Sequence, residues 1–334
     1  MAKYKETDAA NGQGLFLSIN LKKQLLPGTF EYMLDGLIGG KIDISMFDKN
    51  YNNDKTGAKA IPPSTLIKLI IYGYSKGVKS SRGIEEPGKN NITAKALAKD
   101  LEPHWTTIAG FISGNGGIFK DVFVQVLTYC AELGLVGGQT FEIDGCRLPP
   151  NASMSLSGTA DELTKKLGVY RRMAEKHITK HQRRDARGEN DKGTERGFQR
   201  RQKHLNRQIE KISNFLENME KREGTRGNEI KSNVTDNESA IIMSSGEYIQ
   251  GYIGLAVSDS KNQVIVSAQA AGSANECGHL PAMLDGAVNN MNQAGVEMPE
   301  EKTPTLLADK NYFSEENLRV CEDRGMEAII PDSQ

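Results

Sequence analysis

The chain has 334 residues, and its 42 Lys and Arg nearly balance its 43 Asp and Glu, giving a formal net charge of −1. This length predicts two or three domains at about 100–200 residues each, and the 25% charged and 37% hydrophobic fractions exclude a disordered chain. The N-terminus has no signal-peptide run and the most apolar stretch, STLIKLIIYGY, is too short to span a membrane, so we expect a cytoplasmic protein with no membrane partner.

Residues 15–138 predict a helical N-terminal domain, because apolar residues recur there at helical spacing. A first helix covers TFEYMLDGLIGG, whose apolar side chains fall on one face. A second helix follows Pro62-Pro63, and we expect Ser64 to cap it. Shorter helices follow, and a longer one, GIFKDVFVQVLTYCAELGLV, closes the domain.

From residue 139 the pattern changes, and residues 139–334 are expected to form a second domain. QTFEIDGCRL alternates apolar and polar residues, as a strand does. Residues 161–231 then predict two long helices, of which the second carries a narrow apolar stripe. Such a stripe favours an antiparallel helical hairpin inserted into the domain.

This insertion is strongly basic although the whole chain is nearly neutral. Residues 161–231 hold 20 Lys and Arg and 12 Asp and Glu, a charge of +8, and the remainder of the chain carries −9. A basic segment on an acidic protein indicates an anionic partner. Either the charges only solvate the hairpin, or they contact nucleic-acid phosphates. The candidate DNA-binding residues are Arg183, Arg184, Arg187, Arg200, Arg201, Lys203 and Arg207.

Beyond the insertion, strands and helices alternate. Strands are expected at GYIGLAVSD, QVIVSAQA, TPTLLAD and EAIIP, with helices at GHLPAMLDGAVNNMNQAG and SEENLRVCEDRG. Three strands joined as a meander, followed by alternating helix and strand, describe an α+β or α/β domain with a mixed sheet. This is the ribonuclease H-like order, without its final helix.

Two acids follow short apolar runs in predicted strands, Asp144 within the first strand and Asp309 at the end of a later one. Asp144 follows Phe141-Glu142-Ile143, and Asp309 follows Leu306-Leu307-Ala308. Carboxylates that project from the ends of neighbouring strands could share Mg²⁺ or Mn²⁺ ions, which clamp the reacting oxygens of a phosphodiester. The alternative is an Asp that only caps a turn or helix, and a helix is expected to start soon after Asp309.

Several segments, in order, resemble bacterial insertion-sequence transposases of the DDE type. Residues 308–318, ADKNYFSEENL, resemble the family's "AD-x-GY-(F/D)-S-x-E-x-L" around the second acid. Residues 142–153 resemble "DGT-K-I-x-A-N-A-S" around the first, and Thr235-Asp236 with Gly251-Tyr252 is similar to the "TDPDA…GYN" stretch between them. Residues 63–77 and 101–112 resemble the helical N-terminal transposase domain.

The resemblance implies metal-dependent hydrolysis of DNA at insertion-sequence ends, followed by strand transfer. Asp144 and Asp309 would be the catalytic and metal-binding residues, with Mg²⁺ or Mn²⁺ as cofactor. The partners would be the terminal inverted repeats, target DNA and further copies of the chain, assembled on DNA in a bacterial cytoplasm at the nucleoid.

The sequence also departs from the family's pattern. Lys310-Asn311 stands where the family has a small residue and Gly, and Cys146 replaces a Thr. The third acid, a Glu on the helix after the last strand, has no counterpart, so we expect a C-terminally truncated catalytic domain. An alternative is a catalytically inactive DNA-binding derivative that regulates transposition. A dehalogenase-like phosphatase would need Asp at position 142, which is Glu142.

Overall fold

The computed structural model describes residues 18–51, 59–150, 152–189, 192–224, 227–244, 246–296 and 302–332. Two compact units divide the chain, Met1–Leu133 and Gly134–Gln334. The boundary therefore lies five residues before the one placed after residue 138 from sequence. Each helix in the described ranges is too short or too polar to cross a lipid bilayer.

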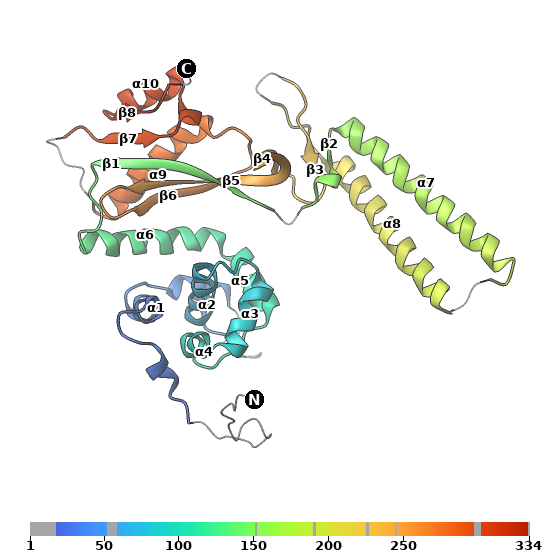
Figure 1. The fold of residues 1–334 in the computed structure, drawn as a ribbon, viewed down its shortest axis with the longest axis horizontal. Coiled ribbons are helices and arrows are strands. Elements are labelled where there is room, and N and C mark those ends of the chain that lie inside the picture. The colour runs from blue at the N-terminus through green and yellow to red at the C-terminus, as the bar shows by residue number, and fades with distance from the viewer. Residues whose placement is uncertain are drawn as a thin grey trace, which may run out of the picture. The chain divides into compact units, whose positions relative to one another are not determined.

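The N-terminal unit is helical, as the apolar spacing predicts (Figure 1). Its core is a single cluster in which Phe47 is fully buried and stacks on Phe111, with ring centroids 5.1 Å apart. The elements are η2 (Leu21–Gln24), α1 (Phe30–Gly40), η3 (Ser45–Asn50), α2 (Pro63–Ser75), α3 (Ser81–Asn90), α4 (Ile92–Ala98), α5 (Trp105–Gly114) and α6 (Gly116–Glu132).

The start of α2 differs from the expectation. The helix begins at Pro63 with Pro62 as its N-cap residue, and no side chain caps it, so the expected Ser64 cap is wrong. Proline suits the first helical position because its φ is already helical and its missing N–H would have no intrahelical partner there.

The C-terminal unit is built on a mixed six-stranded sheet. Strand β1 lies between β5, which is antiparallel to it, and β7, which is parallel to it (Figure 1). β8 continues the sheet in parallel beside β7, and β4 and β6 pair with the first and second parts of β5. The bounds are β1 Thr140–Leu148, β4 Ala240–Ser244, β5 Glu247–Asp259, β6 Val264–Ala271, β7 Thr305–Ala308 and β8 Glu327–Ile329.

Two helices connect the strands of this sheet. α9 (Leu280–Gln293) joins β6 to β7 and packs on β6, and α10 (Glu315–Asp323) joins β7 to β8. The approach of α9 is close, because a Cβ on Gly286 would lie 2.8 Å from Ser267 Oγ. The mixed α/β arrangement and the helical N-terminal unit confirm the coarse fold predicted from sequence.

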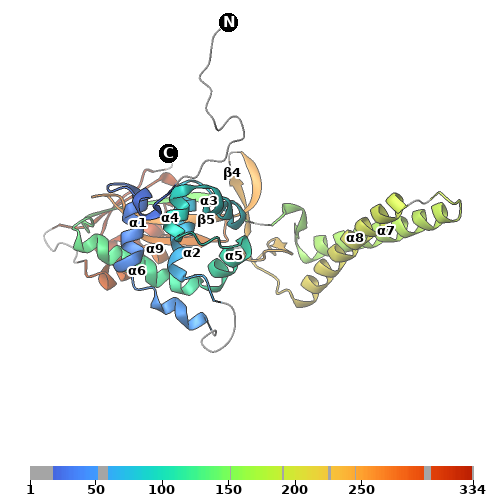
Figure 2. The same ribbon diagram turned by 90° about the horizontal axis from the view of Figure 1, so that it is seen from below.

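A helical hairpin is inserted between β1 and β4, as expected. After η4 (Met154–Leu156) and the short strand β2 (Ser157–Gly158), α7 spans Ala160–Asp185 and α8 spans Lys192–Asn218. The short strand β3 (Ser232–Asn233) pairs with β2 at the base. Figure 2 shows the two helices side by side, and Leu163 and Ile212, both fully buried, form the centre of their shared core.

Polar contacts fix the base of the hairpin. Asn233 donates through Nδ2 to Ser157 Oγ at 2.8 Å, and Ser157 Oγ donates to Gln250 Oε1 at 2.7 Å. All three residues are buried. Because Gln250 lies on β5, this chain of hydrogen bonds connects the hairpin to the sheet.

Candidate active site

The strand register places Asp144 beside Asp309. In the parallel β1–β7 pair, Ile143 lies opposite Ala308, so the next residue on each strand is the predicted acid. Neighbouring strands are about 4.8 Å apart, and residues paired across a sheet project from the same face. Both side chains are exposed. Asp144, in the middle of β1, and Asp309, directly after β7, therefore follow paired residues of neighbouring strands.

Both carboxylates also accept local hydrogen bonds. Asp144 Oδ1 accepts from the Gly145 N–H at 2.7 Å. Asp309 caps η6 (Lys310–Tyr312), since its Oδ1 accepts from the Asn311 N–H at 2.8 Å and its Oδ2 accepts from Asn311 Nδ2 at 2.9 Å. The capping role that sequence left open for Asp309 is therefore real, and it also orients the carboxylate.

A buried phenol lies near the acid pair. Tyr312 is fully buried, and its hydroxyl has no hydrogen-bond partner among the described residues. Burial is the main reason that the pKa of Tyr312 is raised, and the negative charge of Glu276 raises it further. The charges of Asp309 and Asp144 act in the same direction, whereas Arg147 opposes them. The phenol is therefore neutral at ordinary pH, and the four charged side chains lie close enough to act on its pKa.

Glu276 is the residue of this region that the sequence did not reveal. Its side chain is only 8% exposed and is ion-paired with Arg147 Nη1. The carboxyl carbon would lie 3.3 Å from a Cβ on Gly145, the residue after Asp144. Glu276 stands in the connection before α9, where no motif or periodicity marks it. The one sequence signal is Gly145, whose missing side chain leaves room for the carboxylate.

The chemistry of the donors fits a divalent ion in part. Carboxylate oxygens are the ligands that Mg²⁺ and Mn²⁺ prefer, and Mg²⁺ usually keeps several waters while using one or two carboxylates. Asp144 and Asp309 supply two. Among the residues that the structure describes, no group of three or more His, Cys, Asp or Glu is placed to hold an ion. Water would therefore complete the coordination.

All seven predicted DNA-binding residues lie on the hairpin and are exposed. They come from the end of α7, the turn after it and the middle of α8, between residues 200 and 207. Arg187, in the turn, approaches Glu189 at 3.8 Å. The hairpin is thus a basic surface carried on elements separate from the strand ends that hold the acid pair. Its cations are Arg183, Arg184, Arg187, Arg200, Arg201, Lys203 and Arg207.

Two known families match this chain. Residues 19–114 match a family described as Transposase domain (DUF772), and residues 234–332 match the Transposase DDE domain. The second match contains Asp309, whereas Asp144 and the hairpin precede it. No curated protein matches the chain. The matches in the two units thus confirm the resemblance to DDE-type insertion-sequence transposases that the sequence shows.

Proposed function

We propose that the chain cleaves DNA at insertion-sequence ends by metal-dependent phosphodiester hydrolysis and then transfers the freed strand to target DNA. The adjacent register of Asp144 and Asp309 carries this proposal. The family generally uses divalent metal ions, and Mg²⁺ or Mn²⁺ held by the two carboxylates would polarise the phosphoryl group and stabilise the attacking and leaving oxygens. We assign no further acid to the site.

The sheet supports a ribonuclease H-like assignment for the C-terminal unit. Its order β6-β5-β1-β7-β8, antiparallel through β1 and parallel from β1 to β8, is the order expected of that fold. Asp144 lies in the middle of β1, the central strand, and Asp309 directly follows β7, its parallel neighbour. The chain's own contribution to catalysis is orientation, because local hydrogen bonds restrict both carboxylates.

The hairpin and the helical N-terminal unit would bind DNA. Part of the hairpin's basic surface would contact phosphates, and the helical N-terminal unit would bind the terminal inverted repeats or join copies of the chain on DNA. These partners place the protein at the nucleoid. Both family matches are to transposases, and neither supports the alternative of a non-catalytic regulator.

Three variants test the assignment of the acids. Asp144→Asn and Asp309→Asn each remove one charge from the pair, whereas Glu142→Gln removes an exposed charge from the same face of β1, two residues away. We expect each Asp variant to weaken Mn²⁺ binding, measured by calorimetry, by at least about 10–100-fold, and to abolish nicking of a labelled terminal-repeat duplex. Glu142→Gln should change neither measurement.

Equal Mn²⁺ affinity in all three variants would refute the metal assignment. Specific Mn²⁺ binding that depends on both Asp residues, without cleavage of any terminal-repeat duplex, would instead favour the non-catalytic derivative.

A further inference from the structure

The packing between the hairpin helices changes character along their length. Contact residues on α7 recur at spacings of four and three, as in a heptad repeat. Near the base they are the apolar Leu163, Leu167, Tyr170 and Ala174. At the same spacing toward the tip, the next two positions are histidines. The contact positions at the tip are His177 and His181 on α7, with Phe198 and Gln202 on α8.

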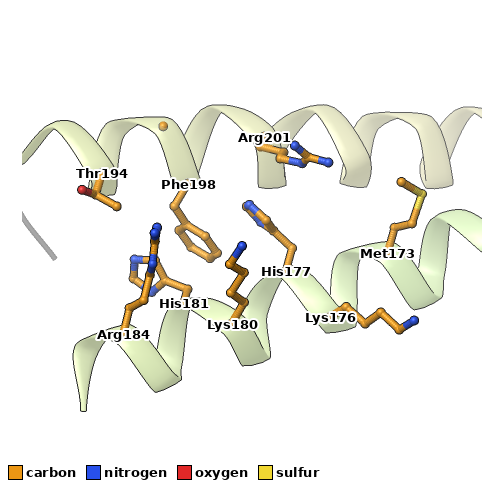
Figure 3. Close-up of a pocket in the computed structure, with 10 residues that line it drawn as sticks. Met173, Lys176, His177, Lys180, His181, Arg184, Thr194, Phe198 and Arg201 are labelled. Atoms are coloured by element: carbon orange, nitrogen blue, oxygen red, sulfur yellow. The ribbon is translucent and has the colours of Figure 1, made fainter. Parts of the chain in front are cut away.

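These polar layers form an ordered stack. Phe198 reaches from α8 between the two histidines (Figure 3), with ring centroids 4.8 Å from His177 and 3.8 Å from His181. Gln202 Oε1 lies 3.3 Å from His177 Nδ1, and Glu195 Oε2 lies 2.8 Å from His181 Nε2. Leucine at the two histidine positions would bury more apolar area, so stability alone does not account for this choice.

A cleft of about 480 Å³ opens beside this stack. Four cations line it, Lys176, Lys180 and Arg184 from α7 and Arg201 from α8. The three on α7 recur every four residues, so they follow one side of the helix at steps of about 6 Å. The described residues that line the cleft include no acid.

The four cations are unneutralised within the described part of the chain. None of their side chains forms an ion pair there, although all four are exposed. The nearby acids Glu195 and Asp185 are directed to His181 instead. A group of cations around a cleft that form no ion pairs of their own is complementary to a polyanion.

We propose that this cleft at the hairpin tip receives the phosphodiester backbone of DNA, with Lys176, Lys180, Arg184 and Arg201 as its phosphate contacts. The inference rests on the proposed function for its partner, and it goes beyond the candidates chosen from sequence. Only Arg184 and Arg201 among those seven line the cleft, and Lys176 and Lys180 were not among them. The stacked rings hold the two helices at the spacing that keeps the cleft open.

Two variants with equal charge changes test the proposal in the full chain. The cleft variant carries Lys176→Gln, Lys180→Gln, Arg184→Gln and Arg201→Gln. The control variant carries Arg183→Gln, Arg196→Gln, Arg200→Gln and Lys203→Gln, which are exposed and do not line the cleft. Binding to a fluorescein-labelled duplex of arbitrary sequence is measured by anisotropy at several salt concentrations, after circular dichroism shows unchanged helicity.

Each phosphate contact contributes about −0.9 to the slope of log K against log salt. We expect the cleft variant to flatten this slope by about 2 to 4 units and the control variant by less than about one unit. Equal flattening in the two variants, or a larger effect in the control, would overturn the proposal. So would tight binding of inorganic phosphate that the cleft variant loses while its DNA slope is unchanged.

This result is independent of the catalytic assignment. Asp144→Asn should keep the wild-type salt slope and lose only metal binding and cleavage. If that variant still cleaves, the proposed chemistry fails, while the comparison of the cleft and control variants still decides whether DNA occupies the hairpin cleft.

Discussion

The ion pair between Arg147 and Glu276 predicts different losses of stability for the removal of its two members. Arg147 is 34% exposed and also donates through Nε to the Met243 carbonyl oxygen at 3.2 Å, whereas its partner Glu276 is only 8% exposed. Arg147→Met would leave a buried carboxylate without a cation. Glu276→Gln would leave an arginine that reaches water and keeps its bond to β4. Arg147→Met should therefore lower the free energy of unfolding more than Glu276→Gln does.

The expected magnitudes follow from that difference in burial. Breaking a buried pair so that one charge stays unpaired costs about 3–5 kcal/mol, which is our estimate for Arg147→Met. Losing a hydrogen bond to a charged group that water can still reach costs about 1–2 kcal/mol, which is our estimate for Glu276→Gln. In the double variant Arg147→Met/Glu276→Gln the destabilisation should be smaller than the sum of the two single costs by about 1–3 kcal/mol.

Urea denaturation can assign the loss to the correct unit. The single tryptophan of the chain, Trp105, lies in the N-terminal unit, so its fluorescence should be the same in every variant. Far-ultraviolet circular dichroism also follows the C-terminal unit, whose midpoint should fall by about 1 to 3 M in Arg147→Met at ordinary urea m-values. A midpoint in Arg147→Met at or above that of Glu276→Gln would refute the reasoning.

Three further changes probe other parts of the C-terminal unit. Gly272→Ala should destabilise it by about 3 kcal/mol or more, visible as a lower thermal midpoint, because the new Cβ would lie 1.6 Å from the Glu238 carbonyl oxygen. Ile212→Ala should cost about 2–5 kcal/mol and speed amide exchange in the hairpin first, because Ile212 is fully buried there. Burial, with a hydrogen bond from its hydroxyl to Asp236, raises the pKa of Tyr252 from 10.0 to about 12. The hydroxyl therefore loses its proton at lower pH in the unfolded chain than in the folded one. The stability that Tyr252 adds is complete below about pH 10 and is lost as pH rises to about 12. The free energy of unfolding should fall less over this range in Tyr252→Phe than in the wild type.

Local patterns were sufficient to predict the two strands that carry Asp144 and Asp309. Alternation of apolar and polar residues determines which face of a strand is buried, and a shift of one residue would move every side chain to the other face. Phe141 and Ile143 on β1 and Leu306 on β7 are buried, so the sequence constrains the register and hence the placement of Asp144 beside Asp309. Fold class and hairpin followed from the same kind of periodicity.

Long-range contacts could not be predicted in this way. Glu276 meets Arg147 across 129 residues of sequence, and nothing near either residue specifies the partner. Tyr312 is similar, because its pKa is raised first by burial and then by charges from three separate segments. Such contacts arise only when α9, β1 and η6 pack together, so they depend on the tertiary structure rather than on a local pattern.

The hairpin shows why charge density along a sequence does not identify a binding surface. Successive residues of an α-helix point about 100° apart, so two adjacent arginines cannot share one face. The sequence predicts DNA binding for both members of the doublets Arg183-Arg184 and Arg200-Arg201. Only the second member of each doublet lines the cleft. The other two cations that line the cleft, Lys176 and Lys180, stand eight and four positions before Arg184, where helical periodicity places neighbours. DNA bound along the cleft would therefore contact Arg184 and not Arg183, although both are exposed arginines.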